Sequence, residues 1–321
     1  MIVNTGLALL DFNPESMVPV FKNPKDIYFK KAKSLQAGDV YAFSTKPVTY
    51  VHDGSLHVSN YKGHFNAKSV VFPKKIDNNL AWMLGLFHGD GCVTSKGIEI
   101  SGNHSEWDVL ARWAALSDKY FSITGRVTRD SHDGNGIRLR IHSVALSKWF
   151  SEIKKSNEPI LVPDCIKYGS PSVRGAYLSG VLDADGRVRP DGVVELATTV
   201  YKEYAKDLAS LSESIGVLPS CTFYSAQRRR DIGTKAKDHY TIKINGNTNR
   251  RNFVRMASLS SKLSGYDSPF GSPRDFGFPV DMFGTIPGYK KNQNILLDSA
   301  IKRGLIEASS HAPLTIKEII K

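Results

Sequence analysis

Two aspartates could carry chemistry in this chain, because each stands before a glycine at the end of a closely related nonapeptide. The nonapeptides are residues 83–91 (MLGLFHGDG) and 178–186 (LSGVLDADG). Asp90 and Asp185 occupy the same place in the two copies, and an internal repeat of this kind sets the architecture of a chain. A pair of carboxylates is also a donor set that hard cations such as Mg²⁺ prefer.

Each nonapeptide is an apolar run without charge until its end, which predicts a helix. Small residues stand four positions apart in both copies: Gly85 and Gly89, Gly180 and Ala184. Residues at this spacing share one helical face, and a face of small residues lets another helix backbone approach closely. The two helices are therefore expected to pack on each other and to bring Asp90 beside Asp185. Gly91 and Gly186 are expected to end their helices in the left-handed conformation.

Two aspartates at such helix ends are unfavourable unless a cation lies near them. Each faces the negative end of its helix dipole, which costs ~0.3–1 kcal/mol at exposed sites. A second carboxylate alongside adds like-charge repulsion. A divalent cation bound by the two carboxylates, backbone carbonyls and water removes both effects, and Mg²⁺ suits such oxygen ligands. The alternative is a pair of core helices that each end in an Asp-Gly turn.

Both nonapeptides resemble the motif of LAGLIDADG homing endonucleases, in the single-chain form that carries two motifs. The second copy has Ser179 where the motif has Ala, and the first has His88 and Gly89 where the motif has Asp and Ala. The aspartate before the last glycine, which the family's mechanism requires, is kept in both copies. The side chain of His88 could point into a core, into solvent or toward a metal.

The resemblance implies a site-specific endonuclease that hydrolyses both strands of DNA with Mg²⁺ or Mn²⁺ and leaves short 3′ overhangs. Asp90 and Asp185 would be catalytic metal ligands, and the backbone carbonyls of Gly89 and Ala184 would add metal contacts. Each half would also supply a basic catalytic residue and an acidic residue that positions water: Arg140 and Glu99 in the first half, Lys243 and Glu195 in the second. The alternative from another class is a non-cutting nucleic-acid binder on the same scaffold, such as an RNA-splicing maturase or a regulator.

The charge of the chain predicts an anionic partner. Its 321 residues carry a net charge of +12, with a pI near 9.4. Neutralisation of phosphates by Lys and Arg supplies most non-specific affinity for nucleic acid. Double-stranded DNA with a long recognition site is therefore the expected partner, bound by a monomer with internal pseudo-two-fold symmetry.

Cysteine usage and hydropathy bear on the cellular compartment of the protein. Cys92, Cys165 and Cys221 offer neither a disulfide framework nor a CxxC metal site. No apolar run reaches the roughly 18 residues of a membrane span, and the first residues lack the pattern of a signal peptide. A soluble intracellular protein without a membrane partner is expected, cytoplasmic if it is prokaryotic or phage-derived, with an organelle left open.

The same series of elements is expected after both nonapeptides. After the first come strand 97–101, helix 105–120 with Ser105 as its N-cap, strands 125–129 and 137–142, and helix 144–153. After the second come strand 194–196, helix 201–215, strands from 222 and over 240–245, and helix 248–258. The predicted fold class is therefore α+β, with two pseudo-symmetric αββαββα halves built on antiparallel sheets.

Helices on one face of each antiparallel sheet leave the other face in solvent, where the polar half of each alternating strand should lie. Those polar sets are Arg138, Arg140 and His142 on one strand, and Thr241, Lys243 and Asn245 on the other. Two such sheets side by side form a basic saddle for a duplex, although any single basic residue could equally be a solvated surface charge. The expected DNA-binding residues are Lys96, Arg126, Arg129, Arg138, Arg187, Arg189, Arg228, Arg229, Arg230, Lys235, Lys237 and Thr241.

The expected division of the chain has five parts. They are a small β-rich N-terminal extension (1–77), a first half (78–158), a linker (159–172), a second half (173–262) and a C-terminal extension (263–321). The C-terminal part has a Gly-, Pro- and Phe-rich stretch over 270–287, an expected helix over 294–301 and an apolar end at 316–320. Its role is left open between docking on the rest of the chain, which is the simpler expectation, and contact with flanking DNA.

Residues 29–40 (FKKAKSLQAGDV) resemble the block that ends the N-terminal splicing half of inteins, directly before an inserted endonuclease. The sequence begins Met1-Ile2 and ends Ile320-Lys321, without the nucleophile and His-Asn pair of a working intein. The N-terminal extension is therefore expected to be an intein-like remnant. A β-rich extension without intein ancestry is the alternative.

Overall fold

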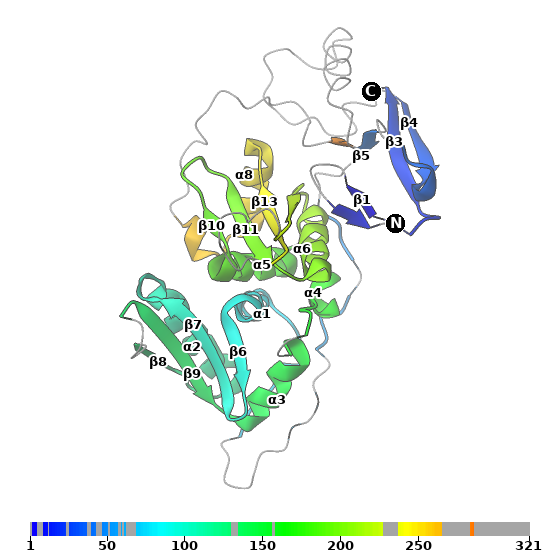
Figure 1. Ribbon diagram of the computed structural model, residues 1–321. Helices are drawn as coiled ribbons and strands as arrows, with labels where there is room; N and C mark the ends of the chain where they lie inside the picture. The colour runs from blue at the N-terminus through cyan, green and yellow to red at the C-terminus, as the bar shows by residue number, and fades with distance from the viewer. Residues whose placement is uncertain are drawn as a thin grey trace.

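The fold is α+β, with the series helix, strand, strand, helix, strand, strand, helix present twice (Figure 1). The computed structural model describes residues 2–4, 9–11, 13–23, 26–36, 40–42, 47–50, 52–56, 59, 61, 69–129, 134–155, 158–226, 237–264 and 283–285. Within these residues no helix combines the length and apolar character needed to cross a membrane.

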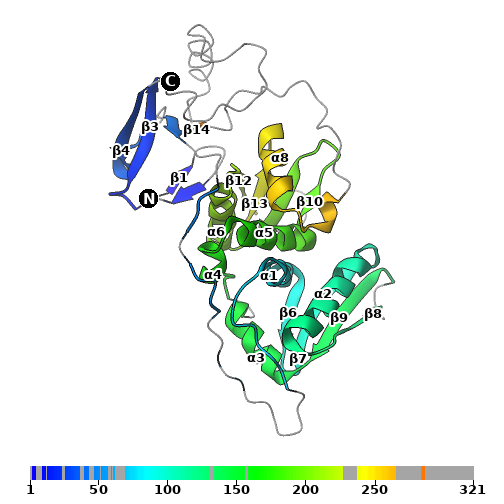
Figure 2. The same ribbon diagram turned by 180° about the vertical axis from the view of Figure 1, so that it is seen from behind.

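The two nonapeptides end helices α1 (Asn78–Asp90) and α5 (Pro171–Asp185), which pack on each other at the centre of the molecule (Figures 1 and 2). Each helix begins at a capping side chain. Asp77 accepts from the backbone N–H of Leu80 at 2.9 Å, and Ser170 accepts from that of Val173 at 3.3 Å. Residues 80–88 and 173–183 are all buried, as expected for helices that are covered on every side.

Small residues set the contact between α1 and α5. A Cβ on Gly85 would lie 2.1 Å from the carbonyl oxygen of Tyr177, and a Cβ on Gly180 would lie 2.0 Å from that of Trp82. These two contacts are equivalent under exchange of the halves. The prediction that the small faces pack against each other is confirmed.

The predicted left-handed conformation of the two terminal glycines is wrong. Gly91 has φ −81° and Gly186 has φ −96°, so both lie in extended backbone that leads directly into a strand. Close approach is the physical reason for glycine here. A Cβ on Gly91 would lie 2.2 Å from the Phe87 ring, and one on Gly186 would lie 2.6 Å from the carbonyl oxygen of Leu196.

In the first half, strands pair antiparallel in the order β6-β7-β9-β8. The elements are β6 (Gly91–Thr94), β7 (Gly97–Asn103), α2 (Trp107–Phe121), β8 (Arg126–Arg129), β9 (Gly136–His142) and α3 (Val144–Ile153). The predicted cap at Ser105 is wrong, because a 3-10 turn, η2 (His104–Glu106), precedes α2. Asn103 caps this turn instead, and the Glu106 side chain accepts from the Asn103 backbone N–H at 2.8 Å.

The second half repeats this arrangement, with strand order β10-β11-β13-β12. Its elements are β10 (Arg187–Val188), β11 (Val194–Thr199), α6 (Lys202–Ser214), β12 (Ser220–Tyr224), β13 (His239–Ile244) and α8 (Asn247–Met256), followed by the 3-10 turn η3 (Ser261–Leu263). The stretch between the halves contains a short helix, α4 (Asp164–Lys167), and α5 begins inside the predicted linker at Pro171.

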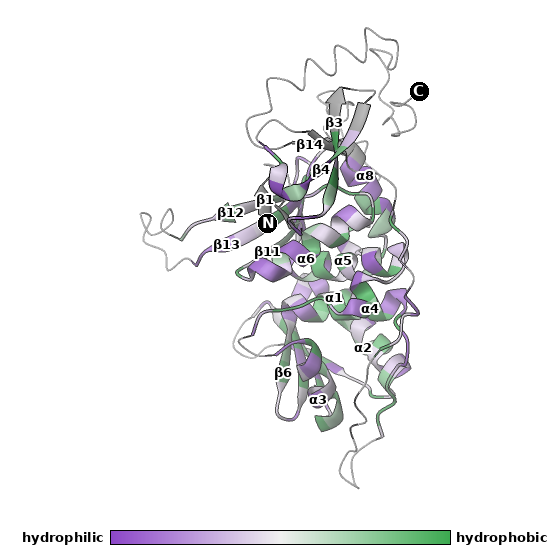
Figure 3. Ribbon diagram, turned by 90° about the vertical axis from the view of Figure 1, so that its right-hand side faces the viewer, coloured by the Kyte–Doolittle hydropathy of each residue, from purple (hydrophilic) through white to green (hydrophobic). Residues whose placement is uncertain are grey.

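Both sheets lie on one side of the molecule and the helices on the other (Figure 3). Apolar strand residues such as Ile100, Leu139 and Ile242 are fully buried in the core between sheet and helices. The opposite sheet faces carry the polar residues and point to the same side. This is the saddle arrangement that the sequence predicts.

The N-terminal extension is β-rich, as predicted. Strands β1 (Ile2–Asn4) and β2 (Leu9–Asp11) form one pair. A second sheet has the order β14-β5-β3-β4, with β3 (Met17–Asn23), β4 (Asp26–Lys31) and β5 (Val40–Ala42). Strand β14 (Phe283–Thr285) comes from the C-terminal extension and pairs with β5. The predicted elements over 294–301 and 316–320 lie outside the described residues.

A short segment of the N-terminal part contacts the second half. The backbone N–H of Val48 donates to Ser214 O at 2.8 Å. The fully buried guanidinium of Arg174 donates to Ser214 O at 3.0 Å and to the carbonyl of Val48, and it lies 5.0 Å from the centre of the Tyr50 ring.

Candidate active site at the motif helix ends

The ends of α1 and α5 bring the two motif aspartates into one site. A Cβ on Gly89 would lie 2.4 Å from the Ala184 Cβ and 3.0 Å from Oδ2 of Asp185. Asp90 is the next residue on α1, so its carboxylate leaves the same helix end. The close packing of small residues therefore determines the separation of the carboxylates.

The surroundings of both aspartates favour their neutral forms. Burial, followed by the charges of Asp185 and Glu106, raises the pKa of Asp90 to about 7. Burial also raises the pKa of Asp185, whose side chain is surrounded by protein yet keeps an exposed edge. Two partly desolvated carboxylates with raised pKa values form a site that a cation would stabilise.

Two lysines lie at equivalent places beside these carboxylates. Lys154 Nζ donates to the carbonyls of Gly89 at 3.1 Å and Gly91 at 2.7 Å, and also to those of Phe87 and His88 at 3.4 and 2.8 Å. In the other half, Lys262 Nζ donates to the carbonyls at the matching motif positions: Ala184 at 3.3 Å and Gly186 at 2.9 Å. Both ammonium groups act against the raised pKa values of the aspartates.

Sequence reasoning missed both lysines. Lys154 directly follows the last predicted helix of the first half, and Lys262 is the last residue of the predicted second half. No spacing pattern marks either of them. Their only sequence signal is a parallel one, since each comes shortly after the last helix of its half.

The donor set suits a divalent cation. Within the described residues no group of three or more His, Cys, Asp and Glu side chains could hold a metal. The site instead offers two carboxylates and the carbonyls of Gly89 and Ala184, which already accept hydrogen bonds from a cationic group. Oxygen ligands of this kind fit Mg²⁺ or Mn²⁺.

His88 lies in the core rather than in solvent. It is fully buried, and its Nδ1 lies 2.5 Å from the hydroxyl of Tyr177, which lies 3.2 Å from that of Tyr204. Burial and then the charge of Lys154 lower the pKa of His88 to about 3, so the ring is neutral. The hydrogen bond between His88 and Tyr177 connects α1 to α5.

The predicted basic and acidic site residues form equivalent ion pairs on the open sheet faces. In the first half, Glu99 lies 3.2 Å from Arg140 and 3.3 Å from Arg138. In the second half, Glu195 lies 3.3 Å from Lys243 and also contacts Arg187. Strand pairing places Glu99 opposite Arg140 and Glu195 opposite Lys243.

The predicted DNA-binding residues fall into three groups. Exposed or half-exposed positions on or beside the open faces are Lys96, Arg126, Arg138, Arg187, Arg189 and Lys237. Thr241 lies on the open face as predicted, but it is only 7% exposed and lies 3.4 Å from Thr198. Arg129 pairs with the buried Ile137, so its side chain leaves the strand on the helix-covered face. Arg228, Arg229, Arg230 and Lys235 lie outside the described residues.

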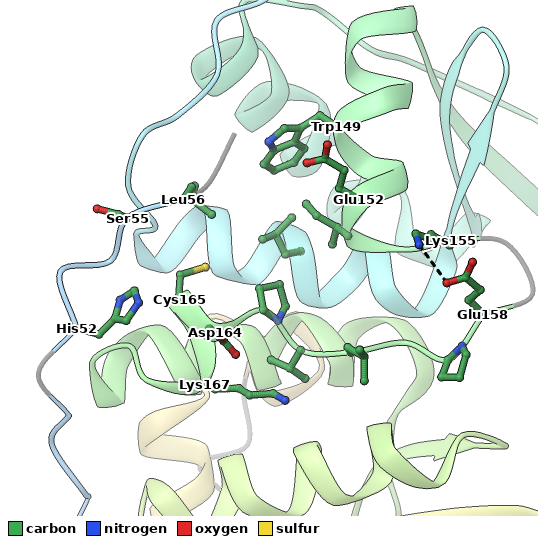
Figure 4. A pocket seen from close by; sticks show the side chains of 16 residues that line it. His52, Ser55, Leu56, Trp149, Glu152, Lys155, Glu158, Asp164, Cys165 and Lys167 are labelled. Atoms are coloured by element: carbon green, nitrogen blue, oxygen red, sulfur yellow. Dashed lines mark ion pairs between the residues drawn. The ribbon is translucent and has the colours of Figure 1, made fainter. Parts of the chain in front are cut away.

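Among the cavities that the described residues form, two lie near the helices and are lined by residues other than the aspartates. One of about 620 Å³ lies between the end of α3, the 158–167 stretch and residues 52–56 (Figure 4). Trp149 and the Lys155–Glu158 ion pair line it. The other, of about 160 Å³, is lined by Lys154, Cys92 and Tyr201.

Comparison with known proteins gives a family match over part of the chain and several distant relatives. Residues 161–268 match the family model described as homing endonuclease. The chain is 24% identical over 215 residues to a glutamine–fructose-6-phosphate aminotransferase of Methanocaldococcus jannaschii, and 23% identical over 179 residues to the DNA-directed RNA polymerase subunit Rpo1C of the same organism. These matches cover 64% and 56% of the chain but only 19% of each relative, so the chain spans about a fifth of their length.

Solved structures that match part of the chain include the homing endonuclease I-DmoI in complex with DNA and Mn, at 15% identity and a TM-score of 0.43, covering 57% of this chain and 97% of that one. Full-length DUF199/WhiA from Thermatoga maritima matches at 13% identity and a TM-score of 0.41, over 71% of this chain and 68% of that one. Over residues 161–268, which carry the second nonapeptide, the chain thus matches a homing endonuclease domain, and it contains the αββαββα series twice.

Proposed function

We propose that this chain is a site-specific DNA endonuclease that cuts both strands of a duplex and leaves short 3′ overhangs. The observation that supports it most is the pair Asp90 and Asp185, with raised pKa values, at the ends of two packed helices between two polar sheet faces. A structural role alone would not favour two carboxylates that repel each other and lose hydration.

Each side chain has a proposed role at the scissile phosphates. Asp90 and Asp185, with the carbonyls of Gly89 and Ala184, would hold Mg²⁺ or Mn²⁺. The chemistry that such a metal supplies when bound is Lewis-acid polarisation of the phosphate and activation of water. Lys154 and Lys262, whose ammonium groups lie at the same helix ends, would stabilise charge that develops on phosphate oxygens.

The open faces would provide the long recognition site. Arg140 and Lys243 would contact the phosphates next to the cleavage positions, and Glu99 and Glu195 would orient them and nearby water. Phosphate contacts of this kind determine the register of the duplex, while other face residues contact base edges. We further propose that a monomer suffices, because one chain supplies both aspartates. The two cutting halves would be residues 78–158 and 173–262, joined by the linker 159–172 and flanked by the extensions 1–77 and 263–321.

Incubation with a plasmid that bears the insertion locus of the chain's own gene tests this function. Linear product in the presence of Mg²⁺, and none with a chelator, is expected. Asp185→Asn should reduce cleavage to background and leave DNA affinity within a few-fold, whereas Asp108→Asn on the exposed side of α2 should cut like the wild type. Tight, specific binding without any cleavage by the wild type would instead indicate the non-cutting binder.

A further inference from the structure

Asp183 is the one acidic motif residue for which the proposed chemistry has no use. It stands two residues before Asp185 on α5, is 1% exposed, and points away from the carboxylate pair into the interface between the halves. Its Oδ2 accepts from Trp82 Nε1 at 2.8 Å and from the Ser261 backbone N–H at 3.2 Å. Its Oδ1 accepts from the Ser260 hydroxyl at 2.6 Å, the Ser261 hydroxyl at 3.1 Å and the Lys262 backbone N–H at 3.3 Å.

Four of these five donors belong to residues 260–262, where the chain enters η3. A buried carboxylate with several donors forms strong, charge-assisted hydrogen bonds. The bonds therefore determine the position of the Lys262 backbone. Its side chain extends from there to the carbonyls of Ala184 and Gly186, and its ammonium also lies 3.5 Å from Glu106.

The first half strengthens this arrangement from the other side of the interface. The guanidinium of Arg112 lies 4.0 Å from the centre of the Trp82 ring. The same group donates to the carbonyl of Leu259 at 2.8 Å, directly before the serines. Trp82 and Arg112 thus hold both Asp183 and the segment that leads to Lys262.

The matching position in the first half works differently. His88 replaces the aspartate, is neutral, and bonds to Tyr177. Its Nε2 has no hydrogen-bond partner among the described residues. The backbone of Ile153 nevertheless raises the pKa of the ring slightly, against the larger lowering caused by burial. Lys154 is placed by its own helix, because its backbone N–H donates to Phe150 O at 2.8 Å. Only the second lysine depends on a motif carboxylate.

We propose that Asp183 is a positioning residue that places Lys262 at the active site through the backbone of residues 260–262. The inference rests on the proposed function, since it assigns Lys262 to the cleavage reaction. Asp183 itself contacts neither substrate nor metal. Its effect on cleavage is exerted entirely through Lys262.

A double-mutant cycle with Asp183→Asn and Lys262→Met tests the coupling. An amide accepts at only one of the two oxygen positions, so Asn leaves either Trp82 or the serines facing an N–H group. Because a misplaced catalytic group typically costs on the order of 10²-fold in rate, each single variant should lower kcat about 10- to 100-fold, with KM for DNA nearly unchanged. The double variant should be no slower than Lys262→Met alone.

Glu213→Gln is the matched control, because Glu213 is another carboxyl with a buried oxygen and a pKa that burial raises to about 8, and it lies on α6, outside the site. It should leave kcat unchanged. If Asp183→Asn does not fold, Ser260→Ala provides a second test, because it removes the shortest of the bonds and keeps the carboxylate. It should lower kcat by a smaller factor, and it should cause no further loss when it is combined with Lys262→Met. Losses that multiply in the double variant, or wild-type cleavage by Asp183→Asn, would overturn the inference.

Hydrogen exchange separates this inference from the proposed function. Both amides that bond to Asp183, those of Ser261 and Lys262, should exchange at least about tenfold faster in Asp183→Asn, because exchange rates follow local opening. This readout needs no cleavage. Unchanged exchange would refute the positioning role, whereas faster exchange in a protein that cuts no DNA would refute only the proposed function.

Discussion

At the scale of single residues, Asp90 couples the pH to the stability of the metal-free protein. Its pKa is about 7 in the folded chain against an ordinary 3.8, so the folded protein binds the proton more tightly. Stability should therefore fall as the pH rises from about 4 to 7 and stay low above that. Asp90→Asn removes this effect and should stabilise the protein at pH 8 by about 1–2 kcal/mol. This is less than the full value of ~1.4 kcal/mol per pKa unit, because Asp90 keeps some contact with solvent.

Thermal unfolding in EDTA measures this change as a rise in Tm of roughly 2–8 °C at pH 8 and none near pH 4. Excess Mg²⁺ should raise the Tm of the wild type and leave that of Asp90→Asn nearly unchanged. Asp108→Asn serves as the control, with no change at either pH. An equal gain for Asp90→Asn at both pH values would contradict the raised pKa.

The aspartates could be predicted from the sequence and the lysines could not, for a physical reason. Asp90 and Asp185 belong to a local repeat whose helical spacing determines where each carboxylate lies. Lys154 and Lys262 reach the same site only because the chain returns to it after a complete half. Thr241 shows a related limit, since alternation predicts its sheet face correctly but not that Thr198 and neighbouring strands cover it.

At the scale of elements, the contact between α1 and α5 should be the part least tolerant of added volume. A Cβ on Gly180 would lie 2.0 Å from Trp82 O and 2.7 Å from Leu86 N, which are backbone atoms that cannot yield without moving α1. Alanine favours a helix over glycine by only ~1 kcal/mol, so overpacking dominates. Gly180→Ala should therefore lower the free energy of unfolding by about 3 kcal/mol, measured by urea denaturation.

Gly134→Ala is the control, because nothing lies within 4 Å of the added Cβ, and its effect should stay within about 0.5 kcal/mol. Equal urea midpoints for Gly180→Ala and the wild type would contradict the packing. The same contacts show what spacing predicts about elements. It predicted which faces meet, but not the extended backbone of Gly91 and Gly186, because each glycine leads directly into a strand that pairs with a later one.

At the scale of the whole molecule, the two halves share a strand order but differ in the charge of their open faces. The first face carries Arg126, Arg138 and Arg140 around Glu99. The second has Lys243 and Arg187 around Glu195, beside the neutral pair Thr198 and Thr241. The repeat in the sequence predicted the common scaffold, whereas this unequal charge follows from residues at which the two copies differ.

The position of both open sheet faces on one side of the molecule predicts which basic residues contribute to the salt dependence of DNA binding. Affinity for a duplex should fall about 10³-fold between roughly 50 and 200 mM salt if several phosphates are contacted. Arg126→Gln on the first sheet's open face should lower the slope of log K against log salt by about 1. Arg255→Gln, equally exposed but on α8 on the helix side, should leave the slope unchanged (Figure 3). Fluorescence anisotropy over a salt series measures the slope for both variants. An equal decrease of the slope for Arg255→Gln would mean that DNA also contacts the helical side, because counterions are released only where a phosphate is bound.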